Sequence, residues 1–235
     1  MALPKISSPL FEITVPSTKK VVKFRPFLVK EEKILLMAQQ SGEEKDVLNA
    51  IMQIINNCVQ DDKFDVVSLS TFDIEYMFLK IRAKSVDNIV ELSFRDNEDE
   101  KVYDFKVNLD DVEVLYDEKN NTKIEINNTS GIIMKYPSAK FADKLVGLNP
   151  TETEFKIVQI CIDKIYTEDE VYSRVDISDS ELEEFIDNLN MQTYNKIKEF
   201  FATMPKMIHK IEYKNSFGND RTIELKTLSD FFTLG

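Results

Sequence analysis

The widest apolar pattern of the chain runs from Ser70 to Ser85, where large apolar residues recur at helical spacing. Only a narrow polar strip interrupts the apolar surface of the helix that this spacing predicts. A helix this apolar is packed on several sides rather than resting on one surface, so we predict that it is the architectural centre of the N-terminal part. Its apolar positions are Phe72, Tyr76, Leu79 and Ala83 on one side, and Ile74, Met77, Phe78 and Ile81 over most of the rest.

A hairpin and two further helices are predicted before this segment. Residues 11–15 alternate between apolar and polar positions, and residues 21–24 return after a Pro-Ser-Thr turn. A helix then follows Phe27. Ser41 followed by Glu44 matches a capping box and predicts the start of the next helix. The apolar stripe of that helix is Val47, Ile51, Ile54 and Cys58.

The apolar pattern changes to a period of two from Asn88 onward. Alternation of this kind is typical of antiparallel strands that have one covered face and one wet face. We therefore predict an antiparallel β-meander between Asn88 and Tyr136. Its strands are expected within residues 90–94, 103–109, 112–116, 124–126 and 132–136.

Helices are predicted after the meander. Thr151 with Glu154, directly after Pro150, and Ser178 with Glu181 match capping boxes. The predicted helices are residues 138–145, the helix after Thr151 with Phe155, Val158, Ile162 and Ile165 inward, the helix after Ser178, and residues 191–204.

A second hairpin and a short apolar cap close the chain. Met207, His209, Ile211 and Tyr213 share one face of the first strand of this hairpin. Helices and antiparallel strands in separate runs predict an α+β fold. The predicted regions are 1–87 (hairpin and three helices), 88–136 (β-meander) and 137–235 (helices closed by a β-hairpin).

Length, charge and apolar runs limit the kinds of partner and the location that we expect for this chain. The 235 residues suffice for one large domain or two small ones. A formal charge of −12 argues against nucleic acid and against an anionic membrane surface, because both would repel the chain. No apolar run is long enough to span a bilayer, and no signal-like segment opens the sequence, so we expect a cytoplasmic protein.

Residues that carry chemistry are few and scattered. His209 lies among apolar residues of a predicted strand, and Cys58 and Cys161 lie far apart in apolar helical patterns, which indicates buried thiols, with a disulfide left open. The acidic run 96–100 lacks the Gly and the Glu that a calcium loop requires. Carboxylate neighbours such as Glu183-Glu184 arise by chance in a chain this acidic. We therefore expect no catalytic, cofactor-binding or metal-binding residues and predict that the protein is not an enzyme.

Two apolar groups are candidates for a protein interface, because aromatic residues and Arg anchor such surfaces. Internal packing is the alternative interpretation of both groups, and it is the one that we favour. The candidates are Phe24, Arg25 and Phe27 at one corner, and Phe231, Phe232 and Leu234 at the C-terminus.

Three stretches resemble one family. They read VKFRPFLVKEEK at 22–33, TFDIEYMFLKIRAKS at 71–85 and FFATMPK at 200–206, and the closing residues 228–232 add to them. The chain resembles the baseplate hub proteins and hub-assembly factors of T4-type contractile-tailed phages. The stretches 96–101 and 117–130 are not part of this resemblance.

The resemblance implies a function in building a phage tail. It implies that the partners are other baseplate hub proteins and that no small-molecule substrate is bound. One hypothesis is an assembly chaperone that works in the host cell cytoplasm. The alternative is a structural hub subunit that stays in the tail of the virion, and a weaker third hypothesis is an enzyme that uses carboxylates.

Overall fold

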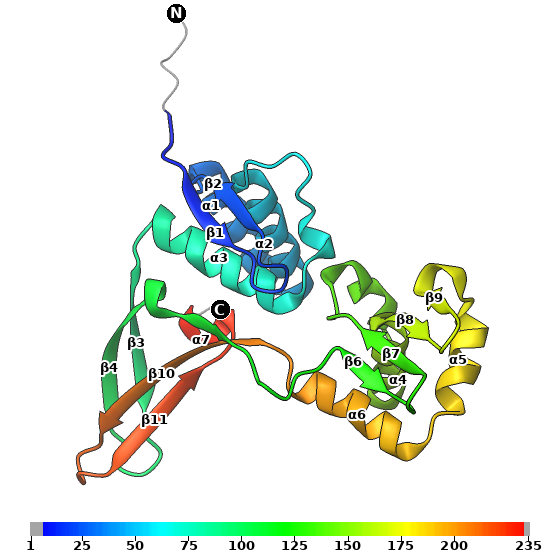
Figure 1. The fold of residues 1–235 in the computed structure, drawn as a ribbon. Helices are drawn as coiled ribbons and strands as arrows, with labels where there is room; N and C mark the ends of the chain where they lie inside the picture. The colour runs from blue at the N-terminus through cyan, green and yellow to red at the C-terminus, as the bar shows by residue number, and fades with distance from the viewer. Residues whose placement is uncertain (1–6, 233–235) are drawn as a thin grey trace, which may run out of the picture. The chain divides into compact units, whose positions relative to one another are not determined.

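The computed structural model describes residues 7–232, apart from the side chains at positions 44, 142 and 143. It divides the chain into two compact units, Met1–Leu115 with Lys206–Gly235 (unit 1) and Tyr116–Pro205 (unit 2). Helices and antiparallel sheets occur in both, which confirms the α+β class (Figure 1).

Unit 1 is built around a helix that the sequence predicts well. α3 begins after its N-cap Ser70, and its buried positions include Phe72, Met77, Phe78 and Ile81. Asp73 fixes the start of this helix: its carboxylate accepts the Ser70 amide and hydroxyl. The helices of unit 1 are α1 (Val29–Ser41), α2 (Glu44–Cys58), α3 (Thr71–Ser85) and α7 (Leu228–Phe231).

Three antiparallel sheets complete unit 1, and in Figure 1 the β3–β4 and β10–β11 hairpins extend away from the helices. The strands are β1 (Phe11–Thr14) with β2 (Val21–Phe24), β3 (Ile89–Arg95) with β4 (Val102–Asn108), and β11 (Asp220–Leu225) with β10 (Lys206–Lys214) and β5 (Glu113–Leu115).

Unit 2 has a core of its own. Ile132, Cys161, Leu182 and Ile197 are fully buried in it. Gly131 is required in this unit, because a Cβ at this position would lie 2.5 Å from the Ile124 carbonyl oxygen. The elements are a four-stranded sheet of β6 (Lys123–Glu125), β7 (Gly131–Met134), β8 (Ile162–Tyr166) and β9 (Val171–Ser173), with helices α4 (Pro150–Cys161), α5 (Asp179–Asp187) and α6 (Met191–Ala202).

The predicted single meander is instead distributed over three sheets. β3 and β4 pair with each other, β5 pairs with β10, and β6–β7 pair with β8. Alternation marks strands but carries no information on partners that are distant in sequence, and here those partners decide the sheets. For the same reason the two units differ from the predicted regions 1–87, 88–136 and 137–235.

Three local predictions are wrong. Ile162 and Ile165 lie in strand β8, because pairing with β7 and β9 overrides their helical spacing. Ser41 is the last residue of α1, since Gly42 with φ 71° ends that helix, and α2 begins after Glu43. Asn149, not Thr151, caps α4. The cap at Ser178 is confirmed, and residues 139–145 form a 3-10 helix.

Candidate protein-binding groove

The first predicted interface corner is part of the interior of unit 1. Phe24 is 2% exposed and Phe27 is 7% exposed. Both side chains are therefore packed inside unit 1, which was the alternative interpretation of the sequence. A role of this corner in an interface stays a prediction.

Arg25 pairs inside the same corner with a buried carboxylate. Its Nη2 lies 2.9 Å from Glu31 Oε1, while the other oxygen of Glu31 accepts the Leu28 amide at 2.8 Å. Burial raises the pKa of Glu31, but the hydrogen bonds from Arg25 and Leu28 and the charges of Arg25 and Lys30 outweigh it, so this pKa is lowered. Arg25 thus fixes the turn from β2 into α1.

Two residues of the second predicted interface group, Phe231 and Phe232, line a groove. Phe231 is 1% exposed, but Phe232 is only half-buried: its ring meets Phe78 edge-on at 6.5 Å, and the Arg82 guanidinium lies 4.5 Å from the ring centre. A cation over an aromatic face is attracted by the ring quadrupole. Leu234 lies outside the described residues.

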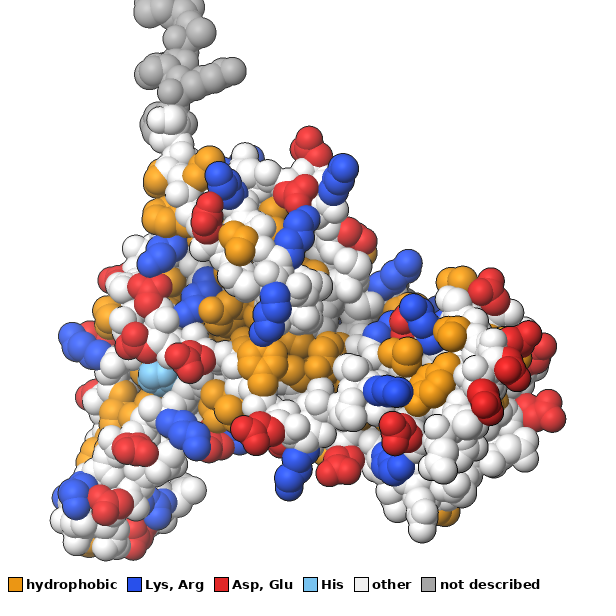
Figure 2. Space-filling view, viewed as in Figure 1, with side chains coloured by type: hydrophobic (Ala, Val, Ile, Leu, Met, Phe, Trp, Pro, Cys, Tyr) orange, Lys and Arg blue, Asp and Glu red, His pale blue; other side chains and the backbone are white. Residues whose placement is uncertain are grey.

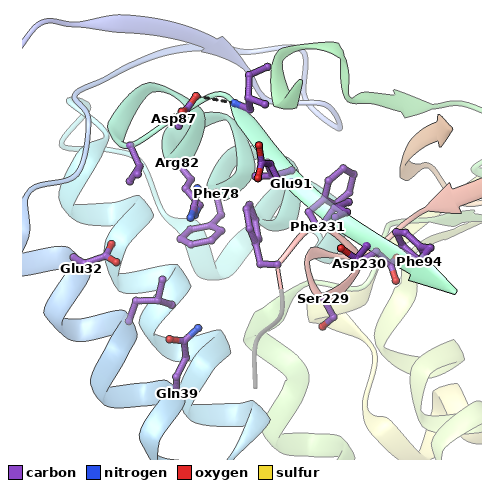
Figure 3. A pocket seen from close by; sticks show the side chains of 17 residues that line it. Glu32, Gln39, Phe78, Arg82, Asp87, Glu91, Phe94, Ser229, Asp230 and Phe231 are labelled. Atoms are coloured by element: carbon purple, nitrogen blue, oxygen red, sulfur yellow. Dashed lines mark hydrogen bonds between the residues drawn. The ribbon is translucent and has the colours of Figure 1, made fainter. Parts of the chain in front are cut away.

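A groove of about 840 Å³ opens beside Phe232 (Figure 3). α1, α3, β3 and α7 each contribute to its lining. The apolar part of the lining includes Phe78, Leu92, Phe94, Phe231 and Phe232, and the polar part includes Glu32, Gln39, Arg82, Asp87, Glu91 and Asp230.

Local structure explains why these side chains converge. β3 alternates between half-buried and exposed residues, so Val90, Leu92 and Phe94 share one face. α7 is held in place by the Asp230 carboxylate, which accepts the amides of Lys226 and Thr227 at 2.8 Å. The groove therefore has walls of regular structure.

The charges around the groove are predominantly negative. Burial lowers the pKa of Arg82, and the carboxylates of Glu32 and Asp87 oppose this shift. On α3, burial and the nearby Asp230 raise the pKa of Glu75 to about 7. The lining within residues 7–232 thus carries the carboxylates of Glu32, Asp87, Glu91 and Asp230, which form its acidic rim, and one guanidinium, that of Arg82.

The groove has the character of a polypeptide site. Apolar residues at its centre with charged residues at its edge are typical of protein interfaces. Within residues 7–232, no three His, Cys, Asp or Glu side chains are placed to hold a metal ion. His209 pairs with Leu225 across β10–β11, reaches the surface (Figure 2), and is not part of this lining.

The cysteines confirm the prediction of buried free thiols. Cys58 and Cys161 are both buried and unbonded to each other, and they lie in different units. Burial raises the pKa of the Cys58 thiol to about 11 and that of Cys161 to about 12. Both thiols are therefore protonated at neutral pH and are poor nucleophiles.

Most residues of the groove were missed at the level of sequence. The period of two in residues 90–94 indicated a face with Leu92 and Phe94, but not which helices this face meets. Arg82 and Glu32 lie on helices whose mutual placement is a tertiary property. The C-terminal aromatic residues were the one signal that pointed here.

The α+β fold thus carries an open, partly apolar groove with a charged border in unit 1. The chain matches the family described as T4 bacteriophage base plate protein over residues 8–233, and it belongs to this family. This confirms the resemblance to T4-type baseplate proteins. Searches of curated proteins and of solved structures gave no match.

A helix that crosses a bilayer must be long and predominantly apolar. Among the helices in residues 7–232, none combines the length and the apolar character that a transmembrane span needs.

Proposed function

We propose that this baseplate protein is a non-enzymatic assembly factor that binds other baseplate hub subunits and promotes formation of the hub. The observation that carries this proposal is the groove of unit 1, with half-buried Phe232 beneath Arg82. Aromatic residues and Arg are the side chains that most often dominate binding energy at interfaces.

The character of the groove favours a releasable partner. An assembly factor must let its client go, and interfaces that open again are smaller and more polar than obligate ones. The rim of Glu32, Asp87 and Asp230 supplies that polarity. We place this work in the host cell during tail assembly.

The alternative is a structural hub subunit that stays in the virion tail. Its permanent interfaces would use exposed apolar side chains, which both units carry. Examples are Val29 at 73%, Met37 at 71%, Val146 at 71% and Val175 at 88% exposure.

The proposal includes no substrate, cofactor, nucleic acid or membrane as a ligand. We expect no turnover, cofactor or small-molecule substrate, because both cysteine thiols are buried and His209 is not part of the groove lining. The charge of −12 disfavours nucleic acid and anionic membranes as partners.

Quantitative mass spectrometry of purified hub intermediates and of mature tails tests the proposal. An assembly factor is expected in the intermediates and absent from mature tails. Presence at a fixed ratio in mature tails would establish the structural subunit instead, and absence from both would contradict either function.

A further inference from the structure

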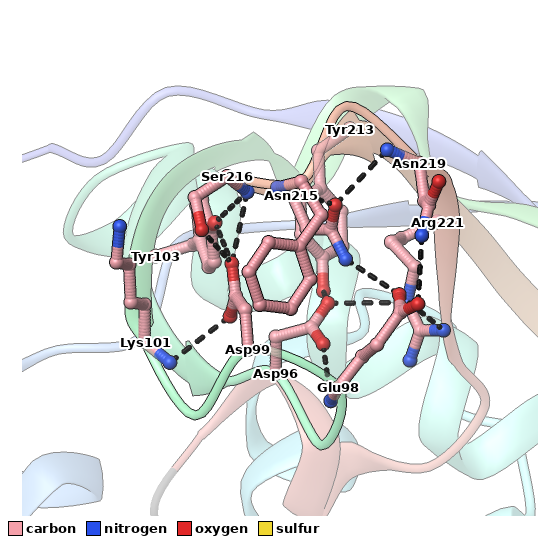
Figure 4. Close-up of polar contacts among 11 residues, drawn as sticks. Asp96, Glu98, Asp99, Lys101, Tyr103, Tyr213, Asn215, Ser216, Asn219 and Arg221 are labelled. Atoms are coloured by element: carbon pink, nitrogen blue, oxygen red, sulfur yellow. Dashed lines mark hydrogen bonds and ion pairs between the residues drawn. The ribbon is translucent and has the colours of Figure 1, made fainter.

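The tips of the two long hairpins of unit 1 are joined by a dense polar cluster (Figure 4). The Tyr213 hydroxyl donates to Asp96 Oδ2 at 2.5 Å, and Arg221 Nε lies 3.1 Å from the same oxygen. The side-chain amides of Asn215 and Asn219 donate to the two oxygens of Glu98 at 2.6 and 2.7 Å. These contacts join the β3–β4 turn to the β10–β11 turn and support it, and we call them the brace.

Asp99 adds a second set of contacts. Its Oδ2 accepts the Tyr103 hydroxyl at 2.6 Å, the Ser216 amide at 2.8 Å and the Ser216 hydroxyl at 2.7 Å. Partial burial raises the pKa of Asp99, but these hydrogen bonds outweigh it and hold this pKa well below its usual range. The carboxylate is therefore charged at neutral pH.

Aromatic packing lies beneath the polar contacts. The ring of Tyr213 on β10 lies 5.0 Å from the ring of Tyr103 and 5.2 Å from that of Phe105, both on β4. Aromatic pairs at these distances stabilise their contact beyond simple burial. Ring packing next to the tips thus adds to the polar contacts that hold the two hairpins together.

The turn that this brace supports presents an aromatic side chain. Asn215 is 4% exposed, and its Oδ1 accepts the amides of Phe217 at 3.1 Å and Asn219 at 3.0 Å. Gly218 adopts φ +86°, a left-handed conformation that favours glycine. Phe217 itself is 67% exposed. Its backbone is fixed while its ring is left in water.

We propose that Phe217 is a preorganised anchor that inserts into an apolar pocket of another baseplate hub protein. Fixing a loop in its bound conformation before binding reduces the entropy lost on association. This explains why so many polar contacts support a turn whose aromatic side chain is largely exposed. The inference rests on the proposed function and adds the kind of pocket that the partner offers.

The charges around Phe217 specify the rim of that pocket. The two tips, residues 96–101 and 214–221, carry five carboxylates and three cationic side chains, and Lys214 and Arg221 pair with carboxylates of the tips themselves. Because negative charge remains in excess, a complementary rim carries Lys, Arg or other hydrogen-bond donors. A second copy of this chain is a poor partner, because its unit 1 groove is bordered by Glu32, Asp87 and Asp230. Like charges placed across an interface suppress such pairing.

Binding of the purified hub proteins of the same phage, measured one at a time by isothermal titration calorimetry, tests the inference. We expect Phe217→Ser to weaken the affinity for one hub protein at least tenfold, and Phe217→Tyr to restore most of it. Asn215→Ala should weaken the same affinity several-fold without removing the ring, because the turn loses its preorganisation.

Val102→Ser is the matched control, since Val102 is 61% exposed on the neighbouring strand β4. Unchanged melting temperatures of Phe217→Ser and Val102→Ser would establish that both variants fold. Equal affinity of Phe217→Ser and the unchanged protein would overturn the anchor and leave the proposed function standing. Failure of the unchanged protein to bind any hub protein would overturn both.

Discussion

At the scale of single residues, Glu75 is the side chain whose titration the fold alters in the most testable way. Burial in α3, together with the nearby Asp230, raises its pKa from 4.5 to about 7. Between these values the folded protein binds more protons than the unfolded chain. The free energy of unfolding therefore falls as the pH rises through this window.

Glu75→Gln removes this cost. The variant is expected to be more stable than the unchanged protein at pH 8, by an amount on the order of 1–3 kcal/mol. At pH 4.5 the two should be nearly equal. Urea unfolding at both pH values measures the difference, with exposed Glu118→Gln as the control. Equal stability of Glu75→Gln and the unchanged protein at pH 8 would show that Glu75 ionises without penalty.

Arg25 illustrates what single residues reveal at the sequence level. Its position between Phe24 and Phe27 suggested an interface anchor, but its guanidinium is directed to Glu31, whose side chain is fully buried. A sequence shows that an Arg is available and not which carboxylate the fold brings to it. The same limit applies to Phe217, which no sequence pattern distinguished from other turn residues.

At the scale of elements, caps decide where helices begin. Asn149 Oδ1 accepts the Glu152 amide at 2.9 Å, and the Glu152 carboxylate accepts the Asn149 amide at 3.0 Å. Pro150 then occupies the first position of α4, where its missing N–H costs nothing. The sequence predicted the same type of cap two residues later.

Replacing each candidate cap separates the two positions. Asn149→Ala is expected to lower the free energy of unfolding by about 1 kcal/mol, because the Glu152 amide loses the Asn149 Oδ1 that accepts it. Thr151→Ala should change it by less than about 0.5 kcal/mol, as usual for exposed positions. Thermal unfolding of both variants measures this. A larger loss for Thr151→Ala than for Asn149→Ala would restore the sequence-based assignment.

Helices and strands were predictable from the sequence where the spacing of apolar residues agrees with the burial that the fold gives them. α3, both hairpins and the cap at Ser178 follow from spacing within the chain. β8 was not predictable, because Ile162 and Ile165 suit a helix equally well and only their pairing with β7 decides. The groove of unit 1 was not predictable for the same reason, since α1 and α7 are far in sequence from the α3–β3 segment that they meet there.

At the scale of the whole molecule, unit 2 is an insertion into unit 1. The chain leaves unit 1 after Leu115 and returns at Lys206, and these two residues are direct partners across β5 and β10. Unit 1 is thus closed by its own strands. Two-residue turns join antiparallel neighbours of this kind.

Excision of unit 2 tests this organisation. A variant in which Asn-Gly replaces residues 116–205 is expected to fold, because β5 and β10 keep their register and the core around α3 is untouched. Cooperative thermal unfolding, followed by circular dichroism, measures this outcome. Gradual unfolding together with strong binding of a hydrophobic dye would contradict the insertion.

The central proposal for the whole molecule is that this baseplate protein acts by binding hub proteins of the baseplate. Sedimentation velocity of the purified chain mixed with each purified hub protein tests it most directly. We predict a faster-sedimenting complex with at least one of them, lost when Phe232 and Leu92 in the groove are both replaced by Ser. A folded chain that sediments alone in every mixture would contradict the claim.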